Sequence, residues 1–463
     1  MEKLKYILIL CLPIFAFFGC VDDSADNPEF GEQDIPHIYL DWQASMAYKL
    51  GQTMKFEPQV SPSDGATYRW TLNGEELSSE KDFSYTLDDF LFNAELKFEV
   101  TRNGVSNSRT ANILVTQDFV PKQAAKKIFG FLTKDGSLGD VDWENITHLV
   151  VSSAVVNADG SLDLSFTQTL NLPMLVAFAH HYGVYVIVEV SGIIRYLNSL
   201  PLYGSLTFYD AALNVPDVLT ANIVNLMTTF NFDGVNIYMD KSTSDSYADP
   251  AGLKDFYIKA GDKIKSDKHT IDGKEYDYIL SMSVVGGWTR ATLAGMVNLP
   301  QYDYVQVLAF LNEDLSPKAH SDPTYVATEI TAWLTWAGQI VENPGKLILV
   351  APAVGLRYFG IPANYTWANL EQFTEYISYR NICAQYPDAA SKNTIVIKDN
   401  NGSATKEVDK IYYDNPRYIE RKVNEIVIPK GLGGMGLWSL ENDSRNPEQS
   451  LLLKMKTTLE TTE

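Results

Sequence analysis

The chain has 463 residues, of which 45% are hydrophobic and 21% are charged, which is typical of a folded protein of about two or three domains. Its formal net charge of −21 argues against nucleic acid as a partner, and against charge-driven binding to anionic lipid, because both need a basic surface. A neutral glycan or a protein partner is compatible with this charge.

The N-terminus has the features of a targeting signal. Residues 6–18 are almost wholly apolar, over a length typical of a signal-peptide core, and two lysines precede them. Gly19, a small residue directly before Cys20, resembles the lipobox of bacterial lipoproteins. The resemblance implies that 1–19 is a signal peptide and that Cys20 carries lipid. An ordinary secretory signal that happens to contain a cysteine is the alternative.

The segment that follows predicts where the protein resides. Residues 20–35 are polar and acidic, without periodicity, as in a flexible tether. The early aspartates resemble the export signal that sends some lipoproteins of Gram-negative bacteria to the outer face of the outer membrane. We therefore expect a lipid-anchored protein on the cell surface, held in the outer membrane through Cys20.

Cysteine and histidine usage predicts neither a disulfide nor a metal site. If Cys11 is removed with the signal and Cys20 is lipidated, Cys383 stands alone as a buried, inert thiol. Because no CxxC motif or histidine-rich cluster occurs, we expect no metal and no cofactor. The pair 180–181, two histidines between a predicted helix and a predicted strand, is expected at the surface.

Residues 36–118 have the pattern of a small all-β domain. Three short runs alternate apolar and polar residues, and the Asn-Gly pairs at 73–74 and 103–104 favour hairpin turns. Several short strands at this spacing predict a β-sandwich of immunoglobulin or PKD-like type, which we expect to act as a spacer. We interpret residues 119–121 as a linker.

From residue 126 to residue 463 the pattern changes to short apolar runs that alternate with helical segments. Eight runs have the composition of fully buried strands: 128–132, 149–156, 184–190, 234–239, 279–284, 304–311, 347–352 and 433–440. Eight strand-then-helix units predict an α/β fold, a TIM (β/α)8 barrel. No GxGxxG motif opens a unit, which disfavours a dinucleotide-binding sheet.

The run 233–240 places polar side chains inside this barrel. Side chains on a strand alternate between faces, so the apolar odd-numbered residues face the helices while Asn236, Tyr238 and Asp240 point inward. Asp240 then lies at the C-terminal mouth of the barrel, where active sites of this fold are found. Periodicity alone makes Asp240 a candidate site residue.

The same run resembles the DGxDxDxE signature of glycoside hydrolase family 18, which holds chitinases and endo-β-N-acetylglucosaminidases. Four further stretches resemble other strands of that family in the family's order, at 146–160, 304–307, 346–355 and 431–443. The resemblance implies a substrate-assisted reaction. In that reaction a glutamic acid protonates the glycosidic oxygen, and an aspartate two residues earlier orients the attacking acetamido group.

The signature positions depart from the family. Asp233 and Gly234 match, and we interpret them as structural. Asp240 occupies the position of the signature's glutamic acid, and Tyr238 that of the assisting aspartate. Asn236 occupies the position of the aspartate before it. Aspartate is one methylene shorter than glutamate, and a misplacement of about 1 Å can cost about a hundredfold in rate. Tyr238 is neutral and offers no anionic oxygen to the acetamido group.

Other positions depart as well. The third strand's SxGG motif reads Glu-Val-Ser-Gly at 189–192, the sixth strand's tyrosine-aspartate pair is Phe-Leu at 310–311, and the seventh strand's tyrosine is Val354. Trp438 remains, and in the family this tryptophan is the floor on which the sugar stacks. Loss of acid chemistry with an aromatic floor retained is the pattern of a binding protein derived from an enzyme.

The candidate ligand-binding residues are the aromatic and polar side chains expected at the mouth or its rim. They are Trp438, Tyr238, Asn236, Glu189, Phe310, Trp288 and Tyr358. For Asp240 the alternatives are a solvated strand end, a ligand contact and catalysis. Glu189 is a carboxylate in an otherwise apolar strand, which is costly unless paired, so we expect a salt bridge to a barrel residue or a partial replacement of the missing acid.

Three functions follow from these residues. The first is a surface lipoprotein that binds N-acetylhexosamine-containing glycans without hydrolysing them. It resembles the glycan-binding members of outer-membrane polysaccharide-capture systems, with glycan-transport proteins as partners. The second is an endo-β-N-acetylglucosaminidase or chitinase-like hydrolase that uses Asp240. The third is a structural module of a surface glycan-uptake complex, which a cleft filled by Tyr238 would favour.

Overall fold

The structure is a computed structural model that describes several segments of the chain: 35–192, 194–197, 200–203, 206–238, 250–285, 295–310, 319–335, 341–360, 373–398 and 407–461. The chain divides into two compact units, Met1–Thr116 and Gln117–Glu463. Within the described segments, no helix is both long and apolar enough to cross a membrane.

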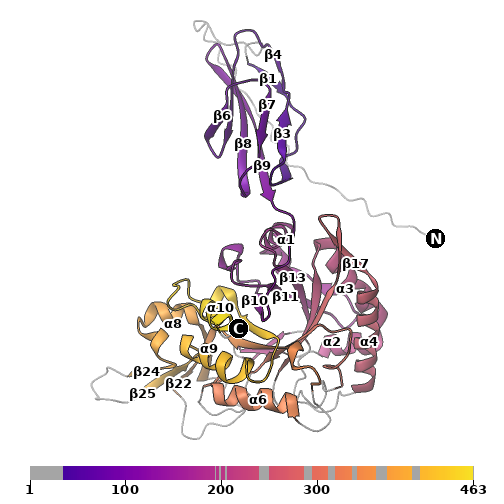
Figure 1. The fold of residues 1–463 in the computed structure, drawn as a ribbon, viewed down its shortest axis with the longest axis vertical. Coiled ribbons are helices and arrows are strands. Elements are labelled where there is room, and N and C mark those ends of the chain that lie inside the picture. The colour runs from indigo at the N-terminus through magenta and orange to yellow at the C-terminus, as the bar shows by residue number, and fades with distance from the viewer. Residues whose placement is uncertain are drawn as a thin grey trace, which may run out of the picture. The chain divides into compact units, whose positions relative to one another are not determined.

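In the described part of the first unit, residues 35–116, the regular elements are all strands (Figure 1). Its main sheet has the order β2-β9-β8-β5-β6, and β1 pairs with β4 and β3 with β7 in two smaller sheets. The strands are β1 (His37–Tyr39), β2 (Ser45–Lys49), β3 (Thr53–Phe56), β4 (Gln59–Ser61), β5 (Thr67–Leu72), β6 (Glu75–Ser78), β7 (Phe83–Thr86), β8 (Leu91–Arg102) and β9 (Val105–Thr116). The predicted all-β domain is confirmed.

Local sequence explains the hairpins and the core of this unit. Asn73, between β5 and β6, and Asn103, between β8 and β9, both have φ of 50°, and a glycine with positive φ follows each, as a tight hairpin turn requires. Trp70 is fully buried, and its ring lies 4.5 Å from that of Phe83 and 4.3 Å from that of Phe98. Stacked aromatic rings therefore fill the space between the sheets.

The second unit is a closed barrel of parallel strands. The strand order is β10-β26-β21-β20-β19-β16-β13-β11, and β10 also pairs with β11, which closes the ring. The strands are β10 (Lys127–Leu132), β11 (His148–Val156), β13 (Tyr185–Ser191), β16 (Gly234–Tyr238), β19 (Ile279–Val285), β20 (Tyr304–Leu308), β21 (Leu347–Pro352) and β26 (Gly434–Trp438). The predicted TIM barrel is confirmed. The apolar runs 304–311 and 433–440 extend past their strands.

Helices lie around the outside of the barrel (Figure 1). Those described are α1 (Leu172–His181), α2 (Leu206–Asn214), α3 (Pro216–Phe230), α4 (Pro250–Ser266), α6 (Pro323–Thr335), α8 (Tyr379–Gln385), α9 (Pro416–Lys422) and α10 (Leu451–Thr461). One apolar layer fills the space between helices and strands, and a second layer, which includes Phe129, Ile187 and Val350, fills the inside. Strands such as β10 and β21 carry apolar side chains on both faces, which explains their continuous apolar runs.

The turn before β16 depends on local sequence. Asn231 ends α3 in the left-handed conformation, with φ of 59°, which asparagine tolerates better than most residues. Gly234 then passes so close to β19 that an added Cβ would lie 2.0 Å from the carbonyl oxygen of Ile279. Only glycine fits at this point of the barrel.

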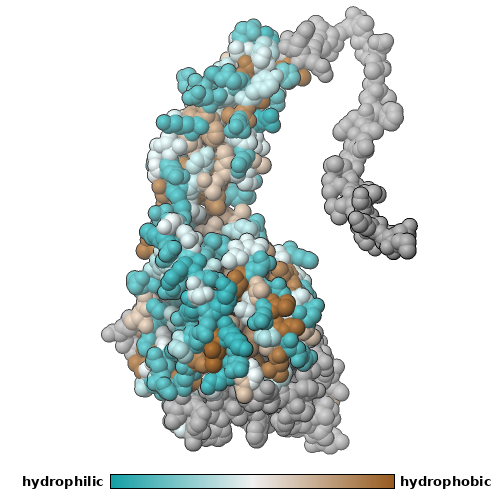
Figure 2. Space-filling view, turned by 90° about the vertical axis from the view of Figure 1, so that its right-hand side faces the viewer, coloured by the Kyte–Doolittle hydropathy of each residue, from teal (hydrophilic) through white to brown (hydrophobic). Residues whose placement is uncertain are grey.

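Shorter strands decorate the barrel. They are β12 (Leu162–Asp163), the hairpins β14 (Ile194–Leu197) with β15 (Leu200–Tyr203) and β17 (Lys268–Ile271) with β18 (Lys274–Asp277), and, between β21 and β26, an antiparallel sheet of β22 (Val354–Phe359), β23 (Thr374–Ser378), β24 (Thr394–Lys398) and β25 (Glu407–Tyr412). On the face shown in Figure 2 the described surface is mainly hydrophilic, with hydrophobic residues scattered among the polar ones.

The interpretation of 119–121 as a linker is wrong at its first residue. Phe119 is 1% exposed and belongs to the barrel unit. Its ring lies 4.8 Å from that of His180 and 5.1 Å from that of Tyr185, and its amide donates a hydrogen bond to Asp272 at 2.7 Å. An apolar ring that finds a buried partner is removed from water, so this segment joins the core.

Candidate functional site

Strand β16 presents alternate side chains to the two sides of the barrel wall, as its pattern predicted. Ile237 is buried in the layer shared with the helices, whereas Tyr238 belongs to the cluster inside the barrel. Asn236 pairs in register with Glu189 of β13 on one side and with Ser281 of β19 on the other. Three polar side chains on neighbouring strands therefore lie at one level inside the barrel.

A cavity of about 500 Å³ lies at the C-terminal end of the barrel. Its described walls come from the last residues of the strands and from the loops that follow them: Phe131, Thr133, Lys134, Asp135, Ser152, Ser153, Val155, Asn157, Asp163, Ser165, Phe166, Glu189, Tyr238, Leu308, Phe310, Trp438, Ser439, Glu441 and Asn442. This end is where barrels of this kind hold their active sites, and the volume is that of a small-molecule site.

Aromatic rings form one part of the cavity wall. The rings of Phe310 and Trp438 lie 6.0 Å apart with their planes at 32°. Trp438 is partly exposed at the end of β26, whereas Tyr238 is only 4% exposed. An exposed indole face beside other aromatic rings suits the apolar face of a sugar ring.

Glu189 lies in the polar part of the same wall and is 5% exposed. Ser152 donates a hydrogen bond from Oγ to Oε1 at 2.6 Å, and Asn236 donates from Nδ2 to Oε2 at 2.8 Å. No cation among the described residues pairs with this carboxylate. The alternative in which Glu189 forms a salt bridge to a barrel residue is therefore wrong for the described part of the chain.

The electrostatics of Glu189 follow from its burial. Burial raises its pKa to about 7, although the hydrogen bonds from Ser152 and Asn236 act in the opposite direction. The carboxyl group therefore titrates near neutral pH. Such a group can act as a proton donor, or can change a ligand contact with pH.

A set of hydrogen bonds fixes the orientation of Asn236. Its Oδ1 accepts from Ser281 Oγ at 2.8 Å and from Gln306 Nε2 at 3.3 Å, and its Nδ2 also donates to Ser283 Oγ at 2.8 Å. The oxygen thus faces donors and the nitrogen faces Glu189. Beneath the cavity, a layer of neutral polar side chains therefore holds Asn236 so that it donates to the carboxylate of Glu189.

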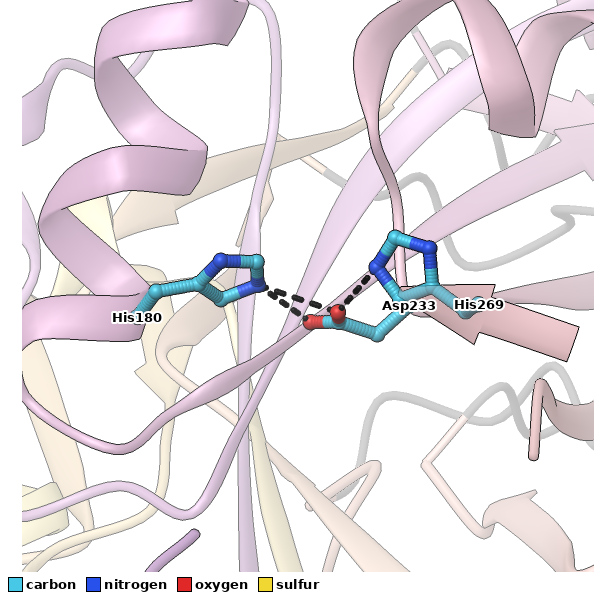
Figure 3. Close-up of side chains that lie close together, drawn as sticks. All are labelled: His180, Asp233 and His269. Carbon is cyan, nitrogen blue, oxygen red and sulfur yellow. Dashed lines mark hydrogen bonds and ion pairs between the residues drawn. The ribbon is translucent and has the colours of Figure 1, made fainter. Parts of the chain in front are cut away.

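Asp233 stands at the opposite end of β16 and joins several elements (Figure 3). His180 Nε2, from α1, lies 3.0 Å from both carboxylate oxygens, and His269 Nε2, from β17, lies 3.0 Å from Oδ1. The amide of Val186 donates to Oδ2 at 2.6 Å. Burial raises the pKa of Asp233, but His180, His269 and Val186 together hold it below its ordinary value. Asp233, the aspartate that matches the signature, is therefore a buried junction: its carboxylate joins α1, β13 and β17 to the start of β16.

The expected surface position of the histidine pair is wrong, because His180 is 7% exposed and His181 is 9% exposed. The buried carboxylate of Asp233 explains the position of His180, since a buried charge needs partners. The ring nitrogens of His180 and His269 lie within 4.8 Å of the Asp233 carboxylate, a spacing that could also hold a metal ion. The absence of a metal stays a prediction.

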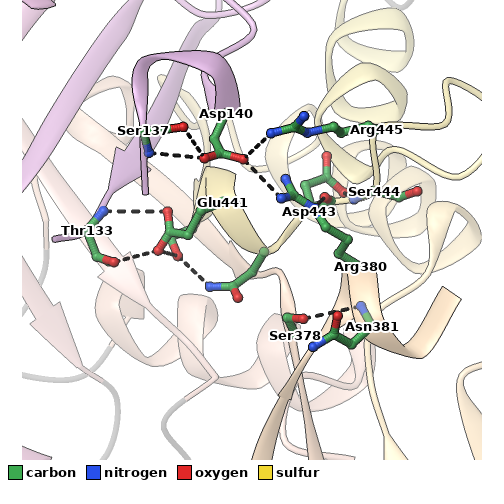
Figure 4. A network of polar contacts seen from close by, with 12 residues as sticks. Thr133, Ser137, Asp140, Ser378, Arg380, Asn381, Glu441, Asp443, Ser444 and Arg445 are labelled. Carbon is green, nitrogen blue, oxygen red and sulfur yellow. Dashed lines mark hydrogen bonds and ion pairs between the residues drawn. The ribbon is translucent and has the colours of Figure 1, made fainter. Parts of the chain in front are cut away.

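Two further acids join the loop after β10 to later parts of the chain, and one of them, Glu441, lines the cavity (Figure 4). Glu441 Oε1 accepts hydrogen bonds from Thr133 Oγ1 and from Ser439 Oγ, both at 2.6 Å. Asp140 Oδ1 accepts from Arg380 at 3.0 Å and from Arg445 at 2.8 Å. These contacts tie the loop after β10 to the chain after β26, and so preserve the cavity wall.

The structure brings together five of the predicted ligand-binding residues. Glu189, Tyr238, Phe310 and Trp438 line the cavity, and Asn236 lies directly beneath it, fully buried. These positions follow from strand parity, because the side chains share the inner face of neighbouring strands.

Other predicted residues do not join them. Tyr358 was expected at the rim but lies in β22, 7% exposed, with its ring 5.9 Å from that of Tyr412, and it is not among the described residues that line the cavity. The sheet inserted after β21 explains the difference, because β22 pairs with β25 and β23 and not with the barrel. Asp240, Trp288 and Cys20 lie outside the described residues.

Sequence reasoning missed several residues of the cavity. Ser152 binds Glu189 and lines the wall, and Asn157 and Phe166 line the side formed after β11. Parity offered a signal for Ser152, since it shares the inner face of β11 with Val150 of the interior cluster. Loop residues such as Phe166 carry no such periodic signal.

Comparison with known proteins agrees with this geometry. The profile of Glycosyl hydrolases family 18 matches residues 127–443, and that of a PKD-like domain matches residues 36–101. No curated protein matches the chain in sequence.

Among solved structures, a chitinase from Bacteroides thetaiotaomicron is 16% identical, with a TM-score of 0.52 over 73% of this chain and 97% of that one. A group IV chitinase from Ostrinia furnacalis, in complex with allosamidin, is also 16% identical, with a TM-score of 0.55 over 73% and 99%. A class V chitinase from Nicotiana tobaccum is 18% identical, with a TM-score of 0.54 over 72% and 99%. These likenesses show the fold, and the profile match spans most of the chain: the protein belongs to glycosyl hydrolase family 18.

Proposed function

We propose that this protein binds glycans that contain N-acetylhexosamine in the cavity at the barrel mouth, and that it does not hydrolyse them by the family's mechanism. The proposal depends on two features observed together: the substituted signature positions on β16 and the retained cavity. Tyr238 and Asn236 occupy the two inner positions where the signature has aspartates, while the cavity beside Trp438 is retained.

The chemistry of these side chains supports binding without turnover. Tyr238 lacks the anionic oxygen that would orient an acetamido group and stabilise a cationic intermediate. The amide of Asn236 is held by its neighbours and cannot ionise. The structure of a class V chitinase related in fold was solved in complex with NAG4, which supports an N-acetylglucosamine-containing ligand for this chain. A cavity that Tyr238 does not fill disfavours a purely structural role.

The test is calorimetric titration of the purified protein with N-acetylglucosamine tetramer and with a high-mannose N-glycan. We expect binding to at least one of them, and we expect Trp438→Ala to weaken it by about tenfold to a hundredfold, because the stacking surface is lost. Tyr376→Ala, in the sheet inserted after β21, is the control and should bind as the parent does. No binding to either glycan, or an unchanged affinity in Trp438→Ala, would contradict the proposal.

A second candidate is a weak hydrolase of the same glycans. The observation that favours it is Glu189, a carboxyl group in the cavity wall whose pKa is raised to about 7. Asp240 is the other candidate acid. Turnover of a high-mannose glycopeptide that disappears in Asp240→Asn or in Glu189→Gln would establish this function. Absence of turnover, with binding retained, supports the first proposal.

The proposed place of action is the cell surface. The apolar run that ends before Cys20 supports a lipid anchor in the outer membrane of a Gram-negative bacterium. From there the barrel would present captured glycan to the proteins of a transport complex. The acidic composition fits a surface-exposed protein with a glycan ligand rather than one that binds nucleic acid.

A further inference from the structure

The cavity wall contains a buried carboxyl group that has no positive partner among the described residues. Glu189 is 5% exposed and lines the cavity, and its hydrogen-bond donors among the described residues are the neutral groups of Ser152 and Asn236. A buried carboxylate is normally paired with a cation or takes up a proton. Because Glu189 faces a cavity, the missing cation can come from a ligand.

The surroundings of Glu189 favour a positively charged ligand. Among the described residues of the cavity wall, Asp135, Asp163 and Glu441 are acidic and only Lys134 is basic. Acidic walls concentrate cations and repel anions, and a site of low dielectric strengthens the effect. Sialylated, uronic-acid or sulfated glycans are therefore disfavoured.

The hydrogen-bond pattern fixes the role of Glu189. Asn236 must donate to Oε2, because its own oxygen already accepts from Ser281 and Gln306. Oε2 therefore acts as an acceptor in either protonation state of Glu189, and the ionised carboxylate has further lone pairs to accept from a ligand donor. A primary ammonium group supplies several hydrogen-bond donors and a positive charge. Hydroxyl and acetamido groups supply fewer donors and no charge.

We propose that the sugar bound beside Glu189 carries a free amino group, so that the preferred glycan is a partly de-N-acetylated N-acetylglucosamine oligomer. This inference rests on the proposed function and narrows its ligand class. The ammonium group forms an ion pair with Glu189, while Trp438 stacks on a sugar ring. No covalent step is involved.

The proposal predicts a proton linkage. Burial holds the pKa of Glu189 at about 7 in the free protein, so part of the population is protonated at neutral pH. An ammonium ion beside the carboxylate lowers the pKa of Glu189, so the carboxyl group releases its proton when the ion pair forms. The amino group of the sugar also titrates near neutral pH, so this release is undiminished only at about pH 6, where the ligand is already an ammonium ion and takes up no proton on binding. A neutral oligomer gives no such release at Glu189.

The experiment is calorimetry at about pH 6, where the sugar amine is charged and Glu189 is mostly protonated in the free protein. It uses the full chain without its signal peptide, with glucosamine tetramer, N-acetylglucosamine tetramer and cellotetraose. Each titration is run in two buffers of different ionisation enthalpy. We expect glucosamine tetramer to bind about tenfold more tightly than its N-acetylated counterpart and to release protons. Glu189→Gln should remove both the preference and the proton release, while Asp255→Asn, an exposed charge change on α4, should leave them intact.

The outcomes separate the two proposals. If N-acetylglucosamine tetramer binds at least as tightly as glucosamine tetramer, the further inference is overturned and glycan binding stands. If the preference persists in Glu189→Gln, the assignment to Glu189 is wrong. If no oligomer binds, the further inference fails, and the proposed function fails with it only if the high-mannose N-glycan does not bind either. Proton release is measured on the parent protein, so the test does not depend on the folding of a variant.

Discussion

At the scale of single residues, the main difference between this cavity and the family signature is the position of one carboxylate. The family resemblance assigns an aspartate to position 236 and a serine to position 189, whereas this chain has Asn236 and Glu189. The two side chains are hydrogen-bonded at 2.8 Å across neighbouring strands. The barrel therefore has an inner carboxylate on β13, next to the position on β16 where the signature has one of its two lost aspartates.

Glu189 predicts a specific pH dependence of stability. Its pKa is 4.5 in an unperturbed chain and about 7 in the folded state, so the folded protein binds the proton more tightly. The contribution of this residue to the free energy of unfolding is therefore largest below about pH 4.5 and declines as pH rises to about 7. Glutamine has the shape of protonated glutamic acid and cannot ionise. We therefore expect the free energy of unfolding of Glu189→Gln to exceed that of the parent by about 1–3 kcal/mol at about pH 8, and to be similar at about pH 5.

Chemical denaturation at the two pH values measures this difference. Asp255→Asn, at an exposed position, is the control and should shift stability equally at both. A Glu189→Gln variant that loses stability at about pH 8 would show that Glu189 is charged and favourably paired in the folded protein.

At the scale of elements, β16 is held at one end by Asp233 and opens into the cavity at the other. The carboxylate of Asp233 binds α1 through His180, β13 through Val186 and β17 through His269. Asn231 and Gly234 supply the turn and the close strand contact on either side. The matched half of the signature therefore builds the barrel, and the divergent half faces the ligand.

Removal of this junction should destabilise the whole barrel. We expect Asp233→Ala to lower the free energy of unfolding by about 3 kcal/mol or more, because His180, His269 and Val186 would lose a shared buried partner. Asp255→Ala should change it by less than about 0.5 kcal/mol. Equilibrium denaturation measures both changes in the free energy of unfolding. Equal changes in the two variants would contradict a stabilising role for the contacts of Asp233.

At the scale of the molecule, the chain consists of two units with separate hydrophobic cores. One core is centred on Trp70 within the all-β unit, and the other fills the barrel in two layers. The family profile lies within the barrel and the PKD-like profile within the first unit. The apolar N-terminal run adds the proposed anchor.

The proposed anchor predicts how the protein fractionates. Expressed in a Gram-negative host, the parent should be found with membranes and should incorporate labelled fatty acid, because Cys20 would carry the lipid. Cys20→Ser should abolish labelling and leave the protein unanchored. Cys383→Ser, at a buried free cysteine, is the matched control and should fractionate as the parent. Labelling that survives in Cys20→Ser would contradict lipid attachment at this residue.

Most of the fold could be predicted from the sequence, because it depends on local patterns. Apolar runs marked the eight barrel strands, and Asn-Gly pairs such as 73–74 marked the hairpins. Parity placed Tyr238 and Asn236 inside the barrel. Loops and insertions lack periodicity, so the position of Tyr358 and the wall formed by Phe166 could not be found in this way.

The sequence by itself determined the barrel, the all-β unit and the loss of the two signature aspartates, since these depend on periodicity and residue identity. Only the tertiary structure decided that Glu189 has no cationic partner among the described residues, and that His180 serves Asp233. Burial and pairing are properties of residues far apart in the chain, and their energies depend on distances that no local pattern encodes.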